Sequence, residues 1–314
     1  MLERTFTVKA SDGTEVFVYG WLPEGAPRGV VQVAHGLAEH AGRYARFAGA
    51  CTARGLAVYA DDHRGHGRTA GDGTLGFFAA ENGWRAVLDD LYRLGDHITG
   101  LHPGVPRVFF GHSMGSFLTQ QVLFERGDQL AGAVLSGCAS GVSNPLAPIG
   151  RLVAKVERAR VGARKPSGVL TRMSFGDYNR AFAPTRTEFD WLSRDPAEVD
   201  RYIADDRCGF EATTQLWVDL LGALPALGAP ANLAQIPKDL PIYLTVGERD
   251  PLHRGLKDFH ALVEGYERAG LRNVTVRVWP DARHAILNET DRDEVTAAIL
   301  RWIDEEPLKR ATSV

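Results

Sequence analysis

Short apolar runs alternate with longer amphipathic stretches through most of this chain. Runs such as residues 29–34, apart from Gln32, and 56–60 are apolar, as expected of strands buried on both faces. Stretches such as 84–99 place apolar residues three or four apart, which predicts amphipathic helices. This alternation predicts an α/β fold with a mostly parallel central sheet and helices on both faces. The expected strands are 29–34, 56–60, 108–110, 131–135, 241–246 and 274–279, and the expected helices are 44–54, 84–99, 116–123, 256–268 and 291–304.

The amino-terminal segment follows a different pattern. Residues 5–8 alternate between polar and apolar side chains, residues 15–19 form a second run rich in β-branched and aromatic residues, and Ser11-Asp12-Gly13 lies between the two runs. Two runs of this kind around a turn sequence predict a β-hairpin ahead of the parallel sheet.

The strand–helix rhythm stops between residues 143 and 237. This segment is rich in arginine, proline and aromatic residues, and contains helix-like stretches such as 215–221. An irregular helical block between two strands of a sheet is typical of a cap. We therefore expect a core formed by residues 1–142 and 238–314, with a helical cap at 143–237.

Composition narrows the class of protein. The chain of 314 residues is 44% hydrophobic and 24% charged with a net charge of −3, which is ordinary for a globular protein and gives no hint of a nucleic-acid partner. No apolar run approaches the ~20 residues that span a bilayer, and the first residues lack the apolar region of a signal peptide. Three widely spaced cysteines favour a reducing compartment over a disulfide framework or metal site. We expect a soluble cytoplasmic protein.

The most informative motif is Gly111-His112-Ser113-Met114-Gly115. It follows an expected strand and precedes an expected helix, which is the setting of a nucleophile elbow. The glycines allow a turn too tight for side chains on either side of the serine. The helix that begins beneath Ser113 directs backbone N–H groups to the place where an oxyanion would form.

A serine nucleophile requires a base and an acid that orients the base. In enzymes with this elbow both come later in the chain, in loops that follow late strands. Asp250 and His284 each follow such a strand closely, so we predict the set Ser113, Asp250 and His284. Glu248 is the alternative acid and His253 the late rival base. Asp250 could instead only cap the next helix.

An oxyanion hole needs two N–H donors. We expect one from Met114, directly after the nucleophile, and one from Leu37, in the loop after strand 29–34. His35 is expected to shape that loop, and His112 to pack beneath the site.

Together these motifs resemble the α/β-hydrolase superfamily, and within it the monoacylglycerol lipase and lysophospholipase group, which is often placed beside the serine aminopeptidases. The resemblance covers nearly the whole chain and is weakest in the cap. It rests on the oxyanion loop at 35–44, the loop at 62–68, the elbow at 111–116, the histidine loop at 283–289, and the cap segments 189–195 and 208–210. Thr69 and Ala285 depart from residues usual in the group.

The loop at 62–68 contains two histidines, but no matching ligand cluster appears elsewhere, so we expect no metal. Asp62 and Arg64 are expected to hold loops together. The proposed chemistry requires no cofactor.

Two features of the cap concern the substrate. Residues 151–172 carry seven basic side chains and one acidic one, Glu157, so this face could contact an anionic lipid surface or simply be solvated. The apolar stripe from Trp217 to Leu224 could line an acyl pocket or seat the cap on the core. Trp191, Trp217 and Leu221 are our candidate substrate-binding residues.

The sequence therefore predicts a serine hydrolase of carboxylic esters, preferring monoacylglycerols or lysophospholipids, with no obligate protein partner evident. An aminopeptidase on the same residues is the main alternative, and would need acidic cap residues such as Glu188, Asp190 or Glu198 to bind an amino group. A non-catalytic ligand receptor on the same fold is a third, which a complete Ser–His–Asp set opposes.

Overall fold

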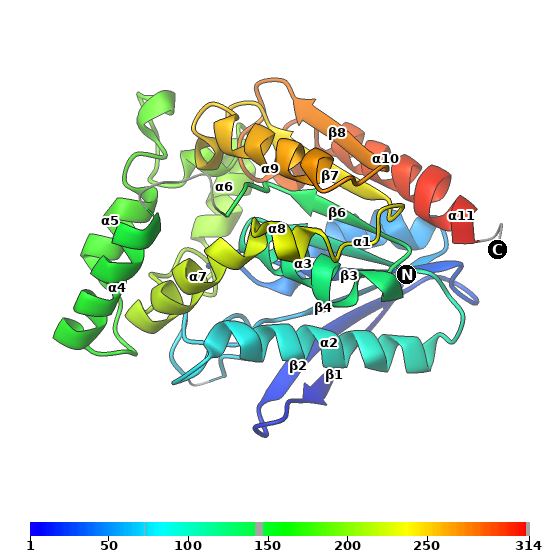
Figure 1. Cartoon of the computed structure of the whole chain (residues 1–314), viewed down its shortest axis with the longest axis horizontal. Coiled ribbons are helices and arrows are strands. Elements are labelled where there is room, and N and C mark those ends of the chain that lie inside the picture. Colours follow the sequence, from blue (N-terminus) through cyan, green and yellow to red (C-terminus); the bar gives the residue numbers. More distant parts are fainter. Residues whose placement is uncertain (72, 142–146, 312–314) are drawn as a thin grey trace.

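A single eight-stranded sheet forms the centre of the protein (Figure 1). The computed structural model describes residues 1–71, 73–141 and 147–311. The strand order is β1-β2-β4-β3-β5-β6-β7-β8; β1, β2 and β4 pair antiparallel, and the remaining pairs are parallel. The strands are β1 Leu2–Lys9, β2 Glu15–Leu22, β3 Gly29–Ala34, β4 Leu56–Asp61, β5 Arg107–His112, β6 Gly132–Ser136, β7 Ile242–Gly247 and β8 Val274–Trp279.

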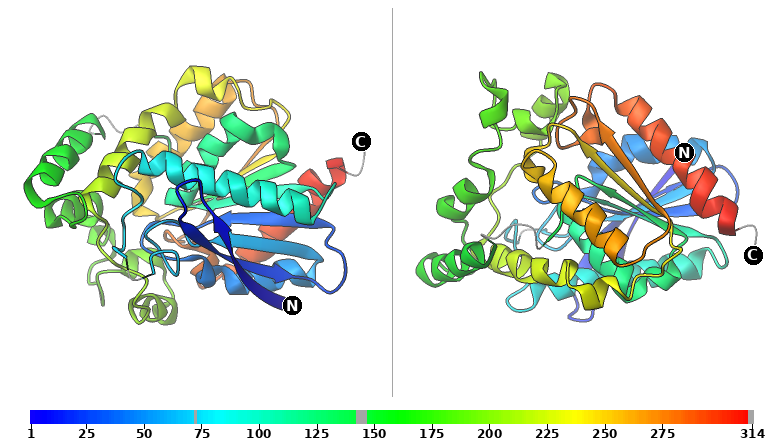
Figure 2. Two further views of the ribbon diagram at one scale, coloured as in Figure 1. Left: turned by 90° about the horizontal axis from the view of Figure 1, so that it is seen from below. Right: turned by 45° about the horizontal axis from the view of Figure 1, so that its top comes forward.

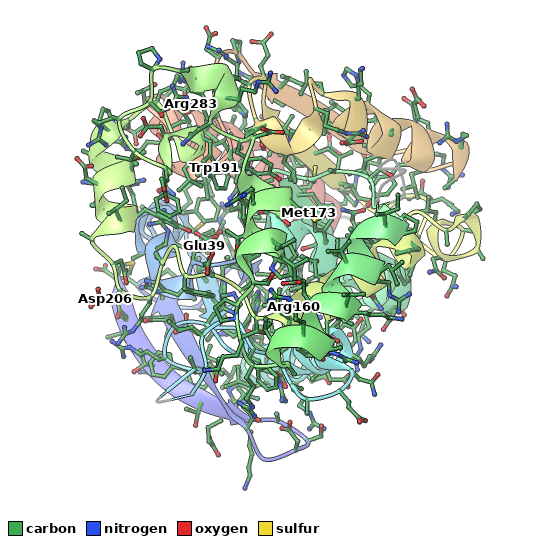
Figure 3. All side chains as sticks on the ribbon, turned by 90° about the vertical axis from the view of Figure 1, so that its left-hand side faces the viewer. Glu39, Arg160, Met173, Trp191, Asp206 and Arg283 are labelled. Carbon is green, nitrogen blue, oxygen red and sulfur yellow. The ribbon has the colours of Figure 1, made fainter. Side chains whose placement is uncertain are left out.

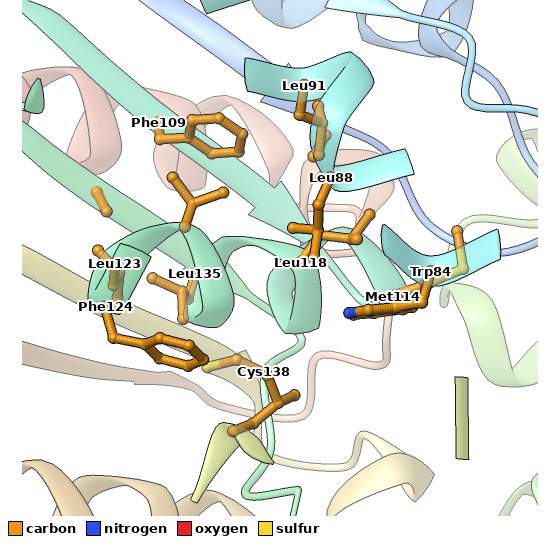
Figure 4. Packing of buried hydrophobic residues seen from close by; sticks show 14 of the residues in the cluster. Trp84, Leu88, Leu91, Phe109, Met114, Leu118, Leu123, Phe124, Leu135 and Cys138 are labelled. Atoms are coloured by element: carbon orange, nitrogen blue, oxygen red, sulfur yellow. The ribbon is translucent and has the colours of Figure 1, made fainter. Parts of the chain in front are cut away.

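Helices cover both faces of the sheet. Successive side chains of a strand point to opposite faces, so Phe109 packs with α2 and α3 whereas Phe110 packs with α1. Figure 4 shows the first of these layers, where Leu88 and Leu91 of α2 lie near Phe109, and Leu118 of α3 lies beside them. The core helices are α1 Ala45–Ala53, α2 Gly83–Leu101, α3 Met114–Arg126, α9 Lys257–Arg268, α10 Arg292–Ile303 and α11 Lys309–Ala311.

Helices α4 to α7 of the segment between β6 and β7 lie beyond one end of the sheet, at the left of Figure 1 and in both views of Figure 2, whereas α8 returns to the core beside α9. Helix α4 packs on α7, and α7 in turn packs on α2 and α3 of the core. The predicted boundary at residues 142 and 143 lies outside the described residues. The helices of this segment are α4 Ala147–Val161, α5 Gly168–Phe175, α6 Pro196–Ile203, α7 Thr214–Leu227 and α8 Pro230–Leu233.

The architecture confirms the predicted mostly parallel sheet and the amino-terminal hairpin. Strands 29–34 and 274–279 have the predicted bounds, while β5 extends on both sides of the predicted 108–110. The extension arises because Gly111 and His112 pair with β6 although their sequence indicates a turn. Among the described residues, no helix combines the length and the apolar character needed to cross a bilayer.

Candidate active site

Ser113 lies in the tight turn between β5 and α3. Its backbone angles are φ 52° and ψ −119°, a combination that a residue with a side chain rarely adopts. The glycines on either side allow this turn. A Cβ on Gly111 would lie 2.0 Å from Thr119 Oγ1, and one on Gly115 would lie 2.0 Å from the carbonyl oxygen of Ala34. The local structure is therefore the strand–turn–helix elbow predicted from the motif.

Asp250 and His284 form a hydrogen-bonded pair behind this turn. His284 Nδ1 lies 2.7 Å from Asp250 Oδ2, and both side chains are buried. The other carboxylate oxygen, Oδ1, accepts the N–H of Leu252 at 2.9 Å. Asp250 thus caps the short helix at Pro251–His253 and holds His284 as well, so the two interpretations offered by the sequence apply together.

A second imidazole contacts the same carboxylate. His253 Nε2 lies 3.0 Å from Asp250 Oδ2, although the angle does not make an aligned hydrogen bond. Burial alone would raise the pKa of the Asp250 carboxyl, but the rings of His253 and His284 outweigh burial and hold it well below its usual value. Asp250 is therefore ionised across the physiological pH range.

His112 packs beside His284, with ring centroids 4.8 Å apart. Its Nδ1 lies 3.2 Å from Ser136 Oγ. Burial, and then the neighbouring His284, lower the pKa of His112 to about 4, so this ring is neutral near pH 7. It packs against His284 and Ser136 and adds no charge near pH 7.

The two predicted oxyanion donors border one cavity. Leu37 and Met114 line it together with Ser113, and neither backbone N–H has a hydrogen-bond partner within the described part of the chain. The preceding N–H, of Gly36, is already bonded to Glu39 Oε1 at 2.7 Å. The Leu37 and Met114 groups are therefore available to a ligand.

His35 holds the loop that carries Leu37. The N–H of His63 donates to His35 Nε2 at 3.0 Å, so the proton of the ring is on Nδ1, which donates to the carbonyl of Gly36 at 2.7 Å. Burial lowers the pKa of His35 well below its usual value and keeps the ring neutral. The role predicted for His35 in shaping this loop agrees with these contacts.

The cavity next to Ser113 has a volume of about 880 Å³ and lies between the core and the helices that follow β6. His284 and the three candidate substrate-binding residues, Trp191, Trp217 and Leu221, all line it. Trp217 is also part of the hydrophobic core, so the stripe on α7 both lines the cavity and seats the helix. Figure 3 shows Trp191 above Glu39, with Met173 on α5 beside them.

The loop of His284 is tied to the segment around Trp191. The N–H groups of His284 and Ala285 donate to the carbonyls of Trp191 and Leu192 at 3.4 and 2.8 Å. The Trp191 ring lies 5.2 Å from the His284 ring. Residues far apart in the sequence thus share the positioning of His284.

Sequence reasoning missed the role of Glu39. This buried carboxylate accepts hydrogen bonds from Gly36 N, Tyr44 Oη and Arg43 Nε, and lines the cavity. Burial favours its protonation, but His112, Arg43 and the hydrogen bonds hold its pKa below the usual value. The position of Glu39 within the motif at 35–40 is the sequence signal from which this role could have been found.

The three acidic residues suggested for an amino-group site are separated. Glu188 lines the cavity, whereas Asp190 is bonded to Thr187 and Glu198 is paired with Arg46 and Arg201. Only Glu188 of the three faces the space in which a substrate would lie.

The loop at 62–68 has the structural role predicted for it. Asp62 accepts the N–H groups of Ala41 and Arg68, and Arg64 is paired with Asp12 and Asp90.

One group of side chains has the composition of a metal site. Ligand atoms of His40, Asp205 and Cys208 lie within 4.8 Å of one another. However, His40 Nδ1 accepts the N–H of Gly42, so Nε2 donates to Asp205, and burial raises the pKa of the Cys208 thiol to about 12. These atoms are occupied by internal contacts and protons, a poor fit to a cation.

Comparisons with known proteins identify the family of this chain. The family model described as serine aminopeptidase, S33, matches residues 25–291. The monoacylglycerol lipase of Mycolicibacterium smegmatis is 30% identical over 298 residues, covering 93% of each chain, and the human monoglyceride lipase is 26% identical over 96% of this chain and 91% of its own. A carboxyl esterase from Bacillus coagulans in complex with glycerol superposes with a TM-score of 0.89 at 27% identity, covering 98% of this chain and 99% of that one.

Proposed function

Since this chain belongs to the serine aminopeptidase S33 family and has the α/β-hydrolase fold, we propose that it hydrolyses carboxylic esters through Ser113, His284 and Asp250. Its likeness to monoacylglycerol lipases, first inferred from motifs, holds over nearly the whole chain. The observation that carries the proposal is the strained elbow of Ser113 at the same cavity as His284, which is paired with Asp250.

The reaction proceeds in two halves. Ser113 Oγ attacks the ester carbonyl carbon while His284 Nε2 accepts the hydroxyl proton, and that proton then passes to the departing alcohol. Water next attacks the acyl-enzyme, giving its proton to His284, which returns it to Ser113 as the acid leaves. The ionised Asp250 holds the Nδ1–H of His284 and stabilises the imidazolium that forms in each half.

The negative charge that develops on the carbonyl oxygen requires fixed donors. The N–H groups of Leu37 and Met114 supply them, because both border the cavity at Ser113 without another partner among the described residues. Loss of one such donor typically costs ~2.7–4 kcal/mol of transition-state stabilisation.

Monoacylglycerols and lysophospholipids are the proposed substrates. The cavity has polar side chains near Ser113, including Glu39 and Arg43, and apolar ones along α7, including Leu220 and Leu224. This division suits a hydrophilic alcohol and a long acyl chain. The names of the relatives and the glycerol bound to the similar esterase support the same substrate class.

We assign residues 143–237 to a cap that meets lipid surfaces transiently. Helices α4 and α5 expose apolar side chains at helical spacing, among them Leu152 at 63%, Val156 at 57% and Met173 at 56% exposure. Exposed basic residues such as Arg151 and Lys155 lie among them. An apolar face with basic neighbours favours binding to an anionic interface. The three unpaired cysteines fit the cytoplasmic location expected from the sequence.

The test compares purified wild-type protein with Ser113→Ala. Substrates are long-chain monoacylglycerols, lysophosphatidylcholine, short p-nitrophenyl esters and amino-acyl anilides. We expect turnover of the long-chain esters by the wild type and loss of about 10³-fold or more in the variant, since the nucleophile is removed. Circular dichroism establishes that the variant is folded.

Other outcomes separate the alternatives. Turnover of anilides alone would identify an aminopeptidase, and Glu188→Gln would then be expected to weaken binding of the amino group. Equal turnover by Ser113→Ala would overturn the assignment of the nucleophile. A protein that binds these lipids but turns over none would be a receptor.

A further inference from the structure

His253 is a fully buried histidine for which the reaction above has no use. It ends the short helix that Asp250 caps, and its ring packs 6.0 Å from that of Phe259 on α9. Neither ring nitrogen has an aligned hydrogen-bond partner among the described residues. Burying such a ring without partners is costly, so an unsatisfied nitrogen here requires an explanation.

One of these two nitrogens, Nε2, lies next to the acid of the site. His253 Nε2 lies 3.0 Å from Asp250 Oδ2, the same oxygen that accepts Nδ1–H of His284 at 2.7 Å. We propose that His253 is a positioning residue, which contacts the same oxygen of Asp250 as His284, holds that carboxylate in place and limits the basicity of His284. This inference rests on the proposed function, because it assigns His253 to the acid of that reaction.

The effect on His284 follows from charge. A neutral His253 with its proton on Nε2 brings a partial positive charge near Oδ2, 3.0 Å away, and so weakens the negative charge that stabilises the His284 imidazolium. A protonated His253 would do so more strongly and would also repel that imidazolium. In both cases His253 lowers the proton affinity of His284, so its removal increases that affinity.

The other titratable groups near Asp250 do not change charge in the relevant pH range. Burial raises the pKa of the Cys138 thiol and of the Tyr178 phenol, and lowers that of His112 to about 4. On α9, Asp258 is paired with Arg254. None of these groups is therefore expected to shape the pH profile between pH 5 and 8.

The experiment measures kcat/KM for a soluble short-chain ester from pH 5 to 9. His253→Phe keeps a ring but removes both nitrogens, His253→Gln keeps an amide donor near the position of Nε2, and His260→Phe is the matched control. His260 is an exposed histidine on α9, seven residues further along the chain. Thermal melting of each variant reports folding separately.

We expect His253→Phe to move the acid limb of the profile upward by about half a pH unit or more. Its kcat should fall roughly tenfold, because the carboxylate loses one of its partners. In His253→Gln the acid limb should lie close to its wild-type position, and in His260→Phe it should be unchanged.

A wild-type profile in a folded His253→Phe protein would overturn the inference. So would a profile shifted equally by His253→Phe and His253→Gln, since the donor would then be irrelevant. If Ser113→Ala lost activity as expected while His253→Phe kept the wild-type profile, the positioning role alone would fail. Activity retained by Ser113→Ala would refute the proposed function instead.

Discussion

Gly115 in α3 and Ala34 at the end of β3 approach so closely that a single methyl group would not fit between them. A Cβ on Gly115 would lie 2.0 Å from the carbonyl oxygen of Ala34 and 2.7 Å from that of His35. Both carbonyls belong to backbone that leads into the loop of Leu37. The elbow and the loop with the second oxyanion donor are therefore packed directly on each other.

Gly115→Ala is expected to lower the free energy of unfolding by about 3 kcal/mol, because backbone rather than a movable side chain opposes the methyl group. The loss of activity should be larger than the loss of stability alone explains, since both proposed oxyanion donors are displaced. Gly49→Ala in α1 is the control, where a Cβ meets nothing within 4 Å and should stabilise by about 0.5–1 kcal/mol. Urea unfolding measures both; equal stability of the two variants would contradict the packing argument.

Most of the core could be predicted from hydrophobic pattern alone. The first and last residues of strands β3 and β8 could be predicted from their hydrophobic pattern. Strand β5 instead ends in Gly111 and His112, whose pairing with β6 depends on the fold. The layout of α4 to α8 could not be predicted, because their apolar faces pack on one another and on the core in an order that periodicity does not encode.

Asp219 of α7 lies close to Gly83 at the start of α2, and its burial leads us to predict a pH-dependent stability. Burial raises its pKa to about 6, although Gln215 donates to Oδ1 at 3.0 Å. In the unfolded chain an aspartate has a pKa of about 3.9, so the folded state binds the extra proton between these two values. Stability is therefore lost as the pH rises from about 4 to about 6.

Asp219→Asn should remove this cost. Because the side chain is half-buried and screened by solvent, we expect a gain of about 1–2 kcal/mol above pH 6 and no difference from wild type below pH 4. Urea unfolding from pH 4 to 8 provides the measurement, with the exposed Asp206→Asn as control. A gain that is the same at every pH would exclude titration of Asp219 as the cause.

Leu221 of α7 lines the cavity. We therefore predict that this side chain controls the length of the acyl chain that the site accepts. In Leu221→Trp the larger ring fills space near the apolar part of the cavity. We expect kcat/KM for p-nitrophenyl laurate to fall roughly tenfold while that for the butyrate stays within about twofold. Equal losses on both esters would mean that the acyl chain does not lie along α7.

The exposed apolar face of α4 predicts binding to lipid surfaces. The double variant Leu152→Glu and Val156→Glu adds two negative charges there and should reduce binding to phosphatidylglycerol vesicles by about tenfold. Turnover of a soluble short-chain ester should be unaffected. Val276→Glu, on the exposed edge strand β8, is the control in the same vesicle sedimentation assay. Similar loss with the control would indicate only general charge repulsion.

The candidate site was predictable where residues follow a strand directly. Ser113, Asp250 and His284 each follow a strand of the parallel sheet, so their order along the chain indicates their neighbourhood. The roles of Glu39 and His253 were harder to predict from the sequence, because they depend on contacts with Gly36 and Asp250 that form only in the tertiary structure. Sequence reasoning considered His253 only as a rival to His284, whereas both rings face the same carboxylate oxygen.

The two backbone hydrogen bonds from the His284 loop to Trp191 and Leu192 make the wall of the cavity and the base parts of one mechanical unit. In the proposed reaction, a substrate group that pushes this wall aside also displaces the ring that we propose accepts the serine proton. We therefore expect discrimination among substrates that contact this wall to be expressed as a difference in turnover rate as well as in binding.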